Sequence, residues 1–431
     1  MPMLNARELE LFSHYITHTS HVIPHGKEDM FPLQVGMPNL AFTNPAVMDA
    51  ILALAASCKS HDIIRSSEAS PEKLEEICDL LRLADRHHQS SLRQLQNDLK
   101  ERQFQSVLPN AALMVLYALS CHHVRVLMAK KVRQLGILLP KDMQPFQSQW
   151  ITSVRAAHVA FVGLLQPGLR SSSELDSPHP NQQGEEEAEL LASSPGPSET
   201  AESKYKFQDG PTEETRRLLL PIISTTYEAA LAKLRARNRD VESSVGPYDA
   251  KLEACGTALK LLEELFQAVM GGGGPPQREE GAPKPRDFGA LDNVPPWLVR
   301  YLARVTSATP SKLWRRRIMA FLNQVPFEFL HLVQLALDCM PVEERQSLSR
   351  DADEPLPLEA AHKPVMDIFA HWLVLVMLLD GVWWIGDVGH WELGRIIRFI
   401  EAQGFVIDLA EGETWWPKTM YAIKSTLGGA A

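Results

Sequence analysis

Four histidines near the N-terminus have a spacing that suggests chemistry. His14, His18, His21 and His25 stand four, three and four residues apart, which would place them along one side of a helix. Imidazole nitrogens at that spacing can bind a transition metal. However, Pro24 ends the expected helix before His25, and no carboxylate joins the row. We therefore interpret the row as a polar helix face or a packing feature, and we predict no metal site.

Two aspartates near the C-terminus form the second arrangement of this kind. Asp380 and Asp387 stand seven residues apart, and paired carboxylates can share general acid and base work. Asp387 is more simply a helix cap, and Asp380 is expected to be a buried, hydrogen-bonded acid. The sequence contains no GxGxxG, GxxxxGKS, GxSxG or HExxH motif, and no aspartate-rich motif typical of a terpenoid cyclase. We predict no catalytic residues and no enzyme activity.

Two arginine clusters are candidates for phosphate contacts or nuclear import signals. The more basic cluster is Arg315, Arg316 and Arg317, and the second spans residues 235–239. A solvated helix face is the simpler interpretation of each cluster. The net charge is −10 and the 43 basic residues are scattered, so this chain alone is not expected to bind a nucleic-acid backbone.

The cysteines and the N-terminus indicate where the protein works. The sequence has no CxxC pair and no cysteine–histidine cluster, so neither a disulfide framework nor a zinc site is expected. Dispersed thiols in an odd number fit a reducing compartment. The N-terminal residues carry charges where a secretory signal peptide has an apolar run, which places the chain in the cytosol or nucleus. The five cysteines are Cys58, Cys78, Cys121, Cys255 and Cys339.

The segment from Pro364 to Gly404 is the element around which the chain is expected to be organised. Pro364 suits a first helical position, an apolar run follows to Leu379, and a second helix begins behind Asp387 after a break at Gly386. Four of the nine tryptophans lie here, which indicates a helix pair buried on nearly all sides. The longest uninterrupted apolar stretch is far shorter than the ~20 residues that a membrane span needs. We therefore predict no membrane span.

The same segment supplies the candidate ligand-binding residues. Its bulky side chains could line a cavity for an apolar ligand. A row of bulky side chains of this kind, taken alone, more often belongs to the hydrophobic core than to a ligand site. The candidates are Trp372, Leu375, Met377, Leu378, Trp383, Trp384 and Trp391.

Helical periodicity extends through most of the remaining sequence. Residues 7–23 and 71–103 show apolar stripes at helical spacing, and Asn44 and Asn110 are each expected to cap a helix. The stretch 26–42 is expected to be a loop because it contains two prolines. No strand-period alternation, hairpin signature or internal repeat is found. The sequence therefore predicts an all-α fold.

Composition divides the chain into five parts. Residues 171–214 are rich in Ser, Pro, Gly and Glu and have almost no branched apolar residues, which predicts a disordered acidic insertion. Residues 271–294 form a Gly/Pro-rich linker. The remaining parts, 1–170, 215–270 and 295–431, are predicted to be helical and to form one large bundle-like unit.

Three sequence patterns, taken in order, resemble a known family. They are ELELFSHYITHTS, LAFTNPAVMDAILALAASCKSH and LVLVMLLDGVWWIGDVGHWELGRII. Together they are similar to the regulatory domain of fungal zinc-cluster transcription factors, in particular the branch of the sterol uptake regulators. The likeness covers almost the entire chain apart from the acidic insertion, and the tryptophan pattern is its most specific part. It implies an all-helical regulatory domain in a nuclear protein that controls transcription by RNA polymerase II.

The resemblance also implies a ligand and partners. The sterol-sensing members hold a sterol in an apolar pocket near the C-terminus and respond by changing their location and activity. The matching region here is Trp372 to Trp391 with the tail EGETWWPKTMYAIKSTLGG. The expected partners are proteins of the transcription machinery, with a homodimer left open. The expected location is the nucleus, with shuttling to the cytoplasm left open, and no cofactor is expected other than a sterol or another apolar ligand.

The sequence departs from this family in one large respect. The binuclear zinc cluster, six cysteines with two CxxC pairs in a basic N-terminal segment, does not occur, so neither its zinc nor its DNA recognition is carried over. Either the gene model is truncated at its 5′ end, or the chain is a stand-alone regulator that reaches DNA through a partner. A lipid or sterol sensor or carrier without direct transcriptional activity is the alternative function, and a helical enzyme is a third for which no motif is found.

Overall fold

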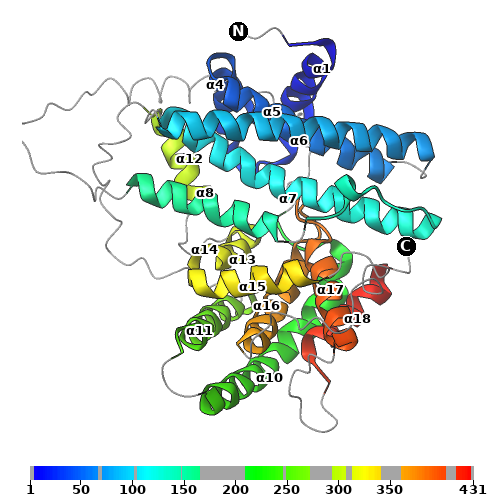
Figure 1. Cartoon of the computed structure of the whole chain (residues 1–431), viewed down its shortest axis with the longest axis vertical. Coiled ribbons are helices and arrows are strands. Elements are labelled where there is room, and N and C mark those ends of the chain that lie inside the picture. Colours follow the sequence, from blue (N-terminus) through cyan, green and yellow to red (C-terminus); the bar gives the residue numbers. More distant parts are fainter. Residues whose placement is uncertain are drawn as a thin grey trace, which may run out of the picture.

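The structure is an assembly of helices. In the part of the chain described here every regular element is helical and none is a strand, which confirms the predicted all-α class. The helices form two groups, one above the other in Figure 1. The computed structural model describes residues 4–66, 70–100, 104–146, 148–165, 209–245, 249–271, 294–306, 313–340, 361–403 and 414–428.

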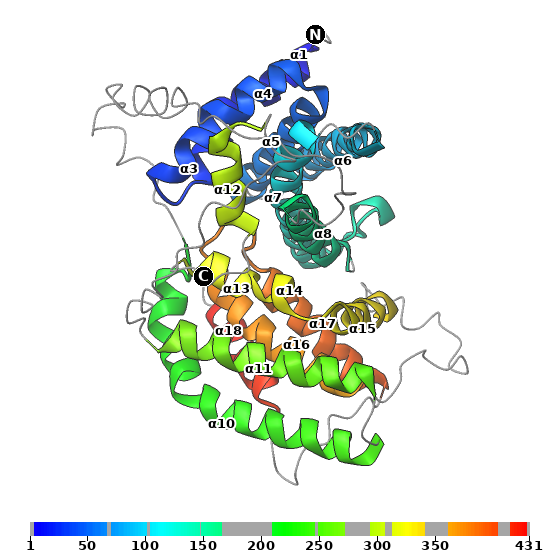
Figure 2. The same ribbon diagram turned by 90° about the vertical axis from the view of Figure 1, so that its left-hand side faces the viewer.

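The N-terminal helix group contains the first eight α-helices and α12. The alanine-rich α5 has most of its side chains buried, and small side chains let α6 and α7 pack closely against it. In Figure 2, α12 lies with this group, and it packs on α7 and α8 although it comes much later in the sequence. The members are α1 (Ala6–His14), α2 (Ser20–Val22), α3 (Lys27–Phe31), α4 (Met37–Thr43), α5 (Pro45–Ser66), α6 (Pro71–Lys100), α7 (Phe104–Leu135), α8 (Gln149–Leu165) and α12 (Pro296–Thr306).

The C-terminal helix group surrounds α16. Almost every side chain of α16 is buried, and α10, α11, α15, α17 and α18 all pack against it. The predicted helix pair that begins at Pro364 is confirmed as α16, a short 3₁₀ turn η5 (Met377–Leu379) and α17, and its predicted end at Gly404 lies outside the described residues. The members are α10 (Glu213–Val245), α11 (Ala250–Met270), α13 (Trp314–Met319), α14 (Phe321–Gln324), α15 (Phe327–Cys339), α16 (His362–Val376), α17 (Val388–Gln403) and α18 (Trp416–Gly428).

Two helices pass a length and composition test for a membrane span. They cover Val107–Leu135 and His362–Leu379, and 78% and 94% of their most apolar windows are buried inside the molecule. The core helices of a globular protein have the same properties, so this is weak evidence for a membrane. We interpret α7 and α16 as buried core helices of the two groups.

Two predictions for the N-terminal group are wrong. Residues 27–42 are helical, as α3, the π-helical turn η2 (Pro32–Gly36) and α4, and Pro32 and Pro38 each stand in the first turn of one of these elements, a position that tolerates proline. Asn110 does not cap a helix, since it lies inside α7. Its Oδ1 instead accepts a hydrogen bond of 3.4 Å from Ser91.

The predicted helix over residues 7–23 is confirmed, with one irregular turn. Between α1 and α2 lies the π-helical turn η1 (Tyr15–Thr19), where the Ser20 N–H donates to the Tyr15 carbonyl. The predicted cap at Asn44 is also confirmed, because the Val47 N–H donates to its Oδ1 over 3.1 Å. The irregular turn therefore sits inside the predicted histidine row.

The predicted disordered insertion, residues 171–214, lies outside the described residues except for 209–214, and this last part is ordered. The Asp209 carboxylate accepts the Trp314 N–H over 2.7 Å at the start of α13. The Thr212 N–H and hydroxyl each donate to Asp380 over 2.8 Å. The prediction is wrong at this edge because both contacts join residues more than a hundred positions apart, which composition does not reveal. The Gly/Pro-rich linker lies outside the described residues except for residues 271 and 294.

Candidate functional site

A small cavity lies where the two helix groups meet. Its volume is about 110 Å³, and α7, α8 and α12 form one wall while α13 and the residues after η5 form the other. The wall is mainly apolar. Representative lining residues are Leu116, Leu119, Val154, Tyr301, Met319 and Trp384.

Trp384 is the one predicted ligand residue that lines this cavity. Trp372 instead packs in the core, where its ring stacks between Trp150 and Phe321 at 6.3 and 5.6 Å. Its Nε1 also donates to the Ile318 carbonyl over 3.0 Å, so the indole is fully engaged. The predicted residues Leu375, Met377 and Leu378 are likewise buried core.

The last two tryptophans of the predicted set lie at the interface between the two helix groups. Trp383 is half-buried and its ring stands 5.3 Å from that of His61 in α5. Trp391 is buried, and the Arg133 guanidinium lies 6.0 Å from the centre of its ring. Both rings therefore hold the N-terminal group against the C-terminal group.

The arginines predicted as a solvated helix face are paired inside the molecule. Arg315 is only 8% exposed, it lies 4.8 Å above the ring of Trp384, and burial lowers its pKa. One nitrogen of Arg316 bonds both oxygens of buried Asp29, at 2.7 and 2.9 Å. Arg317 donates to the Ala268 carbonyl. The solvated-face interpretation is wrong for Arg315, because distant acids and a ring that the local pattern does not show enclose it.

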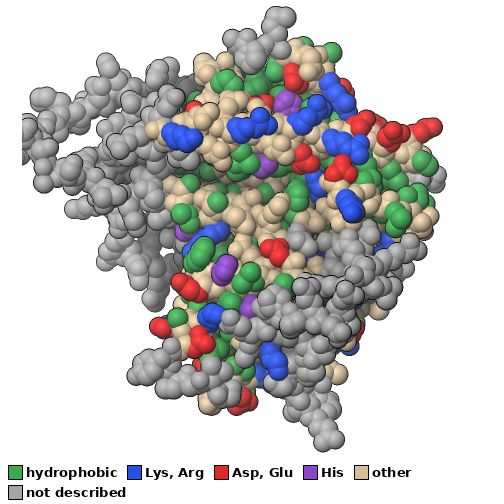
Figure 3. All heavy atoms as spheres, viewed as in Figure 1, with side chains coloured by type: hydrophobic (Ala, Val, Ile, Leu, Met, Phe, Trp, Pro, Cys, Tyr) green, Lys and Arg blue, Asp and Glu red, His purple; other side chains and the backbone are tan. Residues whose placement is uncertain are grey.

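Charges on the face drawn in Figure 3 are mixed. Most of the Lys and Arg side chains visible there lie in a row across the upper helix group, and Asp and Glu side chains lie beside them. In the second arginine cluster Arg235 pairs with Glu263 at 2.7 Å, and Arg237 pairs with buried Asp367 at 2.7 Å. These pairs leave the described arginine clusters poorly suited to bind a phosphate backbone.

The polar groups of the cavity are few and convergent. Arg315 and Arg316 in the cavity lining lie 3.8 and 2.7 Å from the carboxylate of Asp29, which also lines the cavity. Asn323 also lines the cavity, and within the described residues its buried Oδ1 accepts no hydrogen bond. An apolar wall with one unsatisfied acceptor suits an apolar group that carries a hydrogen-bond donor.

The two predicted aspartates serve structural roles. Asp380 accepts hydrogen bonds from the Thr215 hydroxyl and from Lys424, each over 2.6 Å, and its side chain is 8% exposed, as expected for a buried acid. Asp387 stands before the first residue of α17, but its carboxylate binds Lys130 in α7 at 2.9 Å. Burial raises the pKa of Asp387, the Lys130 charge outweighs it, and the pKa is lowered to about 2. Each acid thus neutralises a lysine.

Sequence reasoning missed two adjacent histidines that join the helix groups. His122 donates through Nε2 to Glu392 in α17 over 3.0 Å, and both side chains are fully buried. The Nδ1 of His123 donates to the Trp383 carbonyl over 2.5 Å. Their partners lie 270 and 260 residues away, and a histidine pair within an apolar helix was the only available signal.

The predicted histidine row divides in the folded chain. His14 and His18 both turn toward Asp62 of α5, whereas His21 bonds Gln34 at 3.2 Å. The row does therefore meet a carboxylate. Asp62 was missed because it belongs to another helix.

Acid is expected to destabilise the protein between pH 6.5 and 4. Burial lowers the pKa of His88 and His390 from 6.5 to about 4 and that of His123 to about 3. In this window the unfolded chain binds more protons than the folded chain. The free energy of unfolding therefore decreases as the pH is lowered, by up to about 1.4 kcal/mol per pH unit for each group. His18 has the opposite sign, because its hydrogen bond with Asp62 raises its pKa.

Urea denaturation at pH 6.5, 5.5 and 4.5 measures this dependence. His88→Phe, which cannot be protonated and keeps a ring beside Tyr117, should reduce the slope. Stability that is level or rises toward pH 4.5 would contradict the expectation.

Residues 10–130 match a family model described as the fungal specific transcription factor domain. The match runs from α1 into α7 and includes Asp29, Leu116 and Leu119 of the cavity wall. No match was found among curated proteins or among solved structures. The match therefore covers most of the N-terminal helix group.

Proposed function

We propose that this chain is a transcription regulator whose helical domain responds to a small apolar ligand at the junction of its two helix groups. The match of residues 10–130 to the fungal specific transcription factor domain carries the proposal. The protein acts in the nucleus with other proteins of the transcription machinery. It changes no substrate, in keeping with the two aspartates that hold lysines.

The cavity supports a ligand-responsive role. One wall includes residues inside the matched range, such as Leu119, and the other comes from residues far outside it, such as Trp384. A ligand that contacts both walls changes the free energy of their contact, which is the requirement for a population shift between two arrangements. The output is the surface that the helix groups present to partner proteins.

A sterol is the ligand that the resemblance to sterol uptake regulators suggests. The cavity volume of about 110 Å³ is below the roughly 300–1,000 Å³ typical of pockets that enclose a drug-sized ligand. A whole sterol therefore needs the wall that contains α12 and the opposite wall that contains α13 to move apart. A smaller apolar molecule with one donor for Asn323 enters without that movement.

Contact with DNA is assigned to a partner or to a separate module. The most basic described cluster is occupied by internal partners, among them Asp29 and Asp209. A positive face that follows a phosphate backbone needs arginines that are free to reach it. The helical domain thus acts on transcription through protein contacts.

Fusion of the full chain to a heterologous DNA-binding domain tests the function through a reporter gene. The fusion should change reporter expression, and sterol depletion or addition should shift the response. Ala112→Leu adds three carbon atoms at the cavity wall and should abolish the shift while basal expression remains. Ala232→Leu on the exposed face of α10 is the matched control and should respond as the parent chain does.

A reporter that stays unchanged under every lipid condition would refute the proposal. Mass spectrometry of lipids extracted from the purified protein then decides the alternative function. A stoichiometric sterol or isoprenoid with a silent reporter identifies a carrier or sensor without transcriptional activity. A normal sterol response of the Ala112→Leu variant would show that the cavity is not the ligand site.

A further inference from the structure

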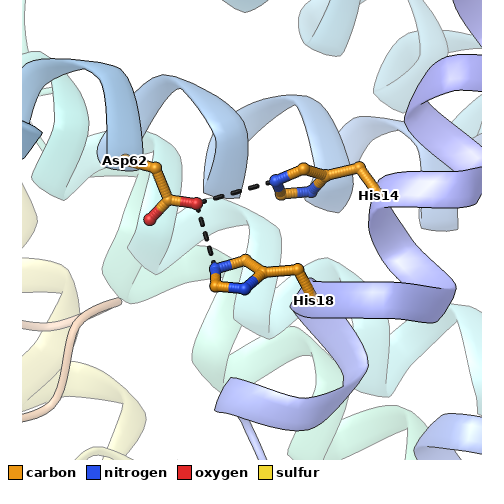
Figure 4. Close-up of side chains that lie close together, drawn as sticks. All are labelled: His14, His18 and Asp62. Atoms are coloured by element: carbon orange, nitrogen blue, oxygen red, sulfur yellow. Dashed lines mark ion pairs between the residues drawn. The ribbon is translucent and has the colours of Figure 1, made fainter.

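Three side chains from two separate segments converge at one point of the N-terminal helix group. Oδ2 of Asp62 lies 3.0 Å from Nε2 of His18 and 3.6 Å from Nε2 of His14. The ligand atoms of all three residues lie within 4.8 Å of one another. Figure 4 shows both imidazole rings directed at the same carboxylate oxygen.

These separations correspond to the edges of a metal coordination polyhedron. Tetrahedral zinc with bonds of about 2.0–2.1 Å places neighbouring ligand atoms roughly 3.3–3.4 Å apart. The two distances in the cluster, 3.0 and 3.6 Å, lie on either side of that value. Two imidazole nitrogens and one carboxylate oxygen suit a divalent transition metal, whereas calcium and magnesium prefer oxygen ligands.

We propose that His14, His18 and Asp62 form a binding site for a divalent transition metal, with zinc as the ion that fits the donor set. Three protein ligands leave a fourth position for water. The side chains are 20%, 35% and 42% exposed, so an ion can enter and a water molecule can reach it. The site lies outside the junction cavity and is independent of the proposed ligand response.

Neighbouring groups orient two of the three ligands. Nδ1 of His14 lies 3.0 Å from the hydroxyl of Thr19, a fully buried residue. When this Nδ1–H donates to Thr19, the lone pair of Nε2 remains for the metal, which is the usual support of a ligating histidine. Nδ1 of His61 lies 3.5 Å from the second carboxylate oxygen of Asp62, so that oxygen also has a partner.

The backbone between the two histidines is unusual in a way that fits a site. Residues 15–19 form the π-helical turn η1, immediately after His14 and including His18. A π-helical turn is a rare irregularity that occurs frequently at functional sites. The π-helical turn in the backbone and the convergence of the side chains on the Asp62 carboxylate are two independent observations at the same place.

The metal would fasten the N-terminal helices near the junction of the groups. It joins His14 and the turn η1 to α5. The ring of His61, the residue before Asp62, lies 5.3 Å from the ring of Trp383 in the C-terminal group. An ion that binds the folded state and not the unfolded state stabilises the folded chain by mass action. The alternative is an ion-pair cluster of the same residues that never takes up metal.

Metal titration of the full chain, without a polyhistidine tag and stripped with a chelator, separates these alternatives. Zn²⁺ is followed by calorimetry and Co²⁺ by its visible absorption. The parent chain should bind one equivalent. His18→Ala and Asp62→Asn should each lose saturable binding, and Thr19→Val should weaken it by about 10–100-fold.

His331→Ala is the matched control because His331 is an exposed histidine far from the cluster in sequence. It should bind metal as the parent chain does, and circular dichroism should show that every variant remains helical. No saturable uptake by the parent chain would overturn the proposal. Equal uptake by the parent chain and His18→Ala would identify an adventitious ion only.

Discussion

Glu392→Ala is expected to destabilise the protein by about 3–5 kcal/mol. The Glu392 carboxylate is fully buried and accepts hydrogen bonds from His122 over 3.0 Å and from Arg395 over 2.8 Å. Arg395 is itself 2% exposed. Truncation leaves its charge in the core without a counter-ion, a far larger cost than the loss of one surface contact.

In the Glu392→Ala variant, Arg395 would keep two hydrogen bonds, both to backbone carbonyls. It donates to Leu337 over 3.2 Å and to Met340 over 3.3 Å, and neither oxygen replaces a carboxylate charge. The network therefore links α7, α15 and α17, and its loss should loosen the contact between the helix groups as well as the C-terminal core.

Urea denaturation of the full chain measures this effect. Glu401→Ala is the matched control, since Glu401 lies on the same helix but pairs with Lys418 in the open, where the two side chains are 53% and 56% exposed. An exposed pair contributes about 0–1 kcal/mol, so the control should unfold close to the parent chain. Equal effects of the two substitutions would show that the buried network contributes no more to stability than the exposed ion pair does.

Gly386→Ala is expected to cost about 2–6 kcal/mol, the sum of roughly 1–3 for a strained backbone and roughly 1–3 for overpacking. Gly386 has a φ of +44°, a region that side chains disfavour. A Cβ there would lie 2.1 Å from Cε1 and 2.2 Å from Nε2 of His123. The imidazole would have to leave its bond to the Trp383 carbonyl.

Two comparisons separate the two parts of this cost. Gly136 has a φ of +67° but open space around a Cβ, so Gly136→Ala isolates the backbone part. In a His123→Ala background, Gly386→Ala should lose the overpacking part and cost no more than Gly136→Ala does. Denaturation midpoints of the four variants measure the difference. A full cost that persists without His123 would contradict the proposed clash.

The reporter assay measures whether Gly386→Ala also affects the proposed ligand response. Trp383 and Trp384 precede Gly386 directly, and Trp384 lines the junction cavity. A displaced His123 should move this short segment. The variant is therefore expected to lose the ligand response even at temperatures where it stays folded.

Local patterns determined the helices and the class of the fold. The apolar run from Pro364 and the break at Gly386 predicted α16 and α17, because helical periodicity and helix ends depend on neighbours within one or two turns. The same locality predicted the cap at Asn44. It failed at Pro32, since a proline in a first turn and a proline that ends a helix look alike in a short window.

Only the tertiary structure decided which side chains meet. The row of His14 and His18 acquired Asp62 from α5, Arg316 acquired Asp29, and one tryptophan, Trp384, reached the cavity. Such pairs join residues up to several hundred positions apart, and their energy depends on burial and on distances of a few ångströms. A sequence fixes helical periodicity residue by residue, but the partner of a charge depends on how the helices pack.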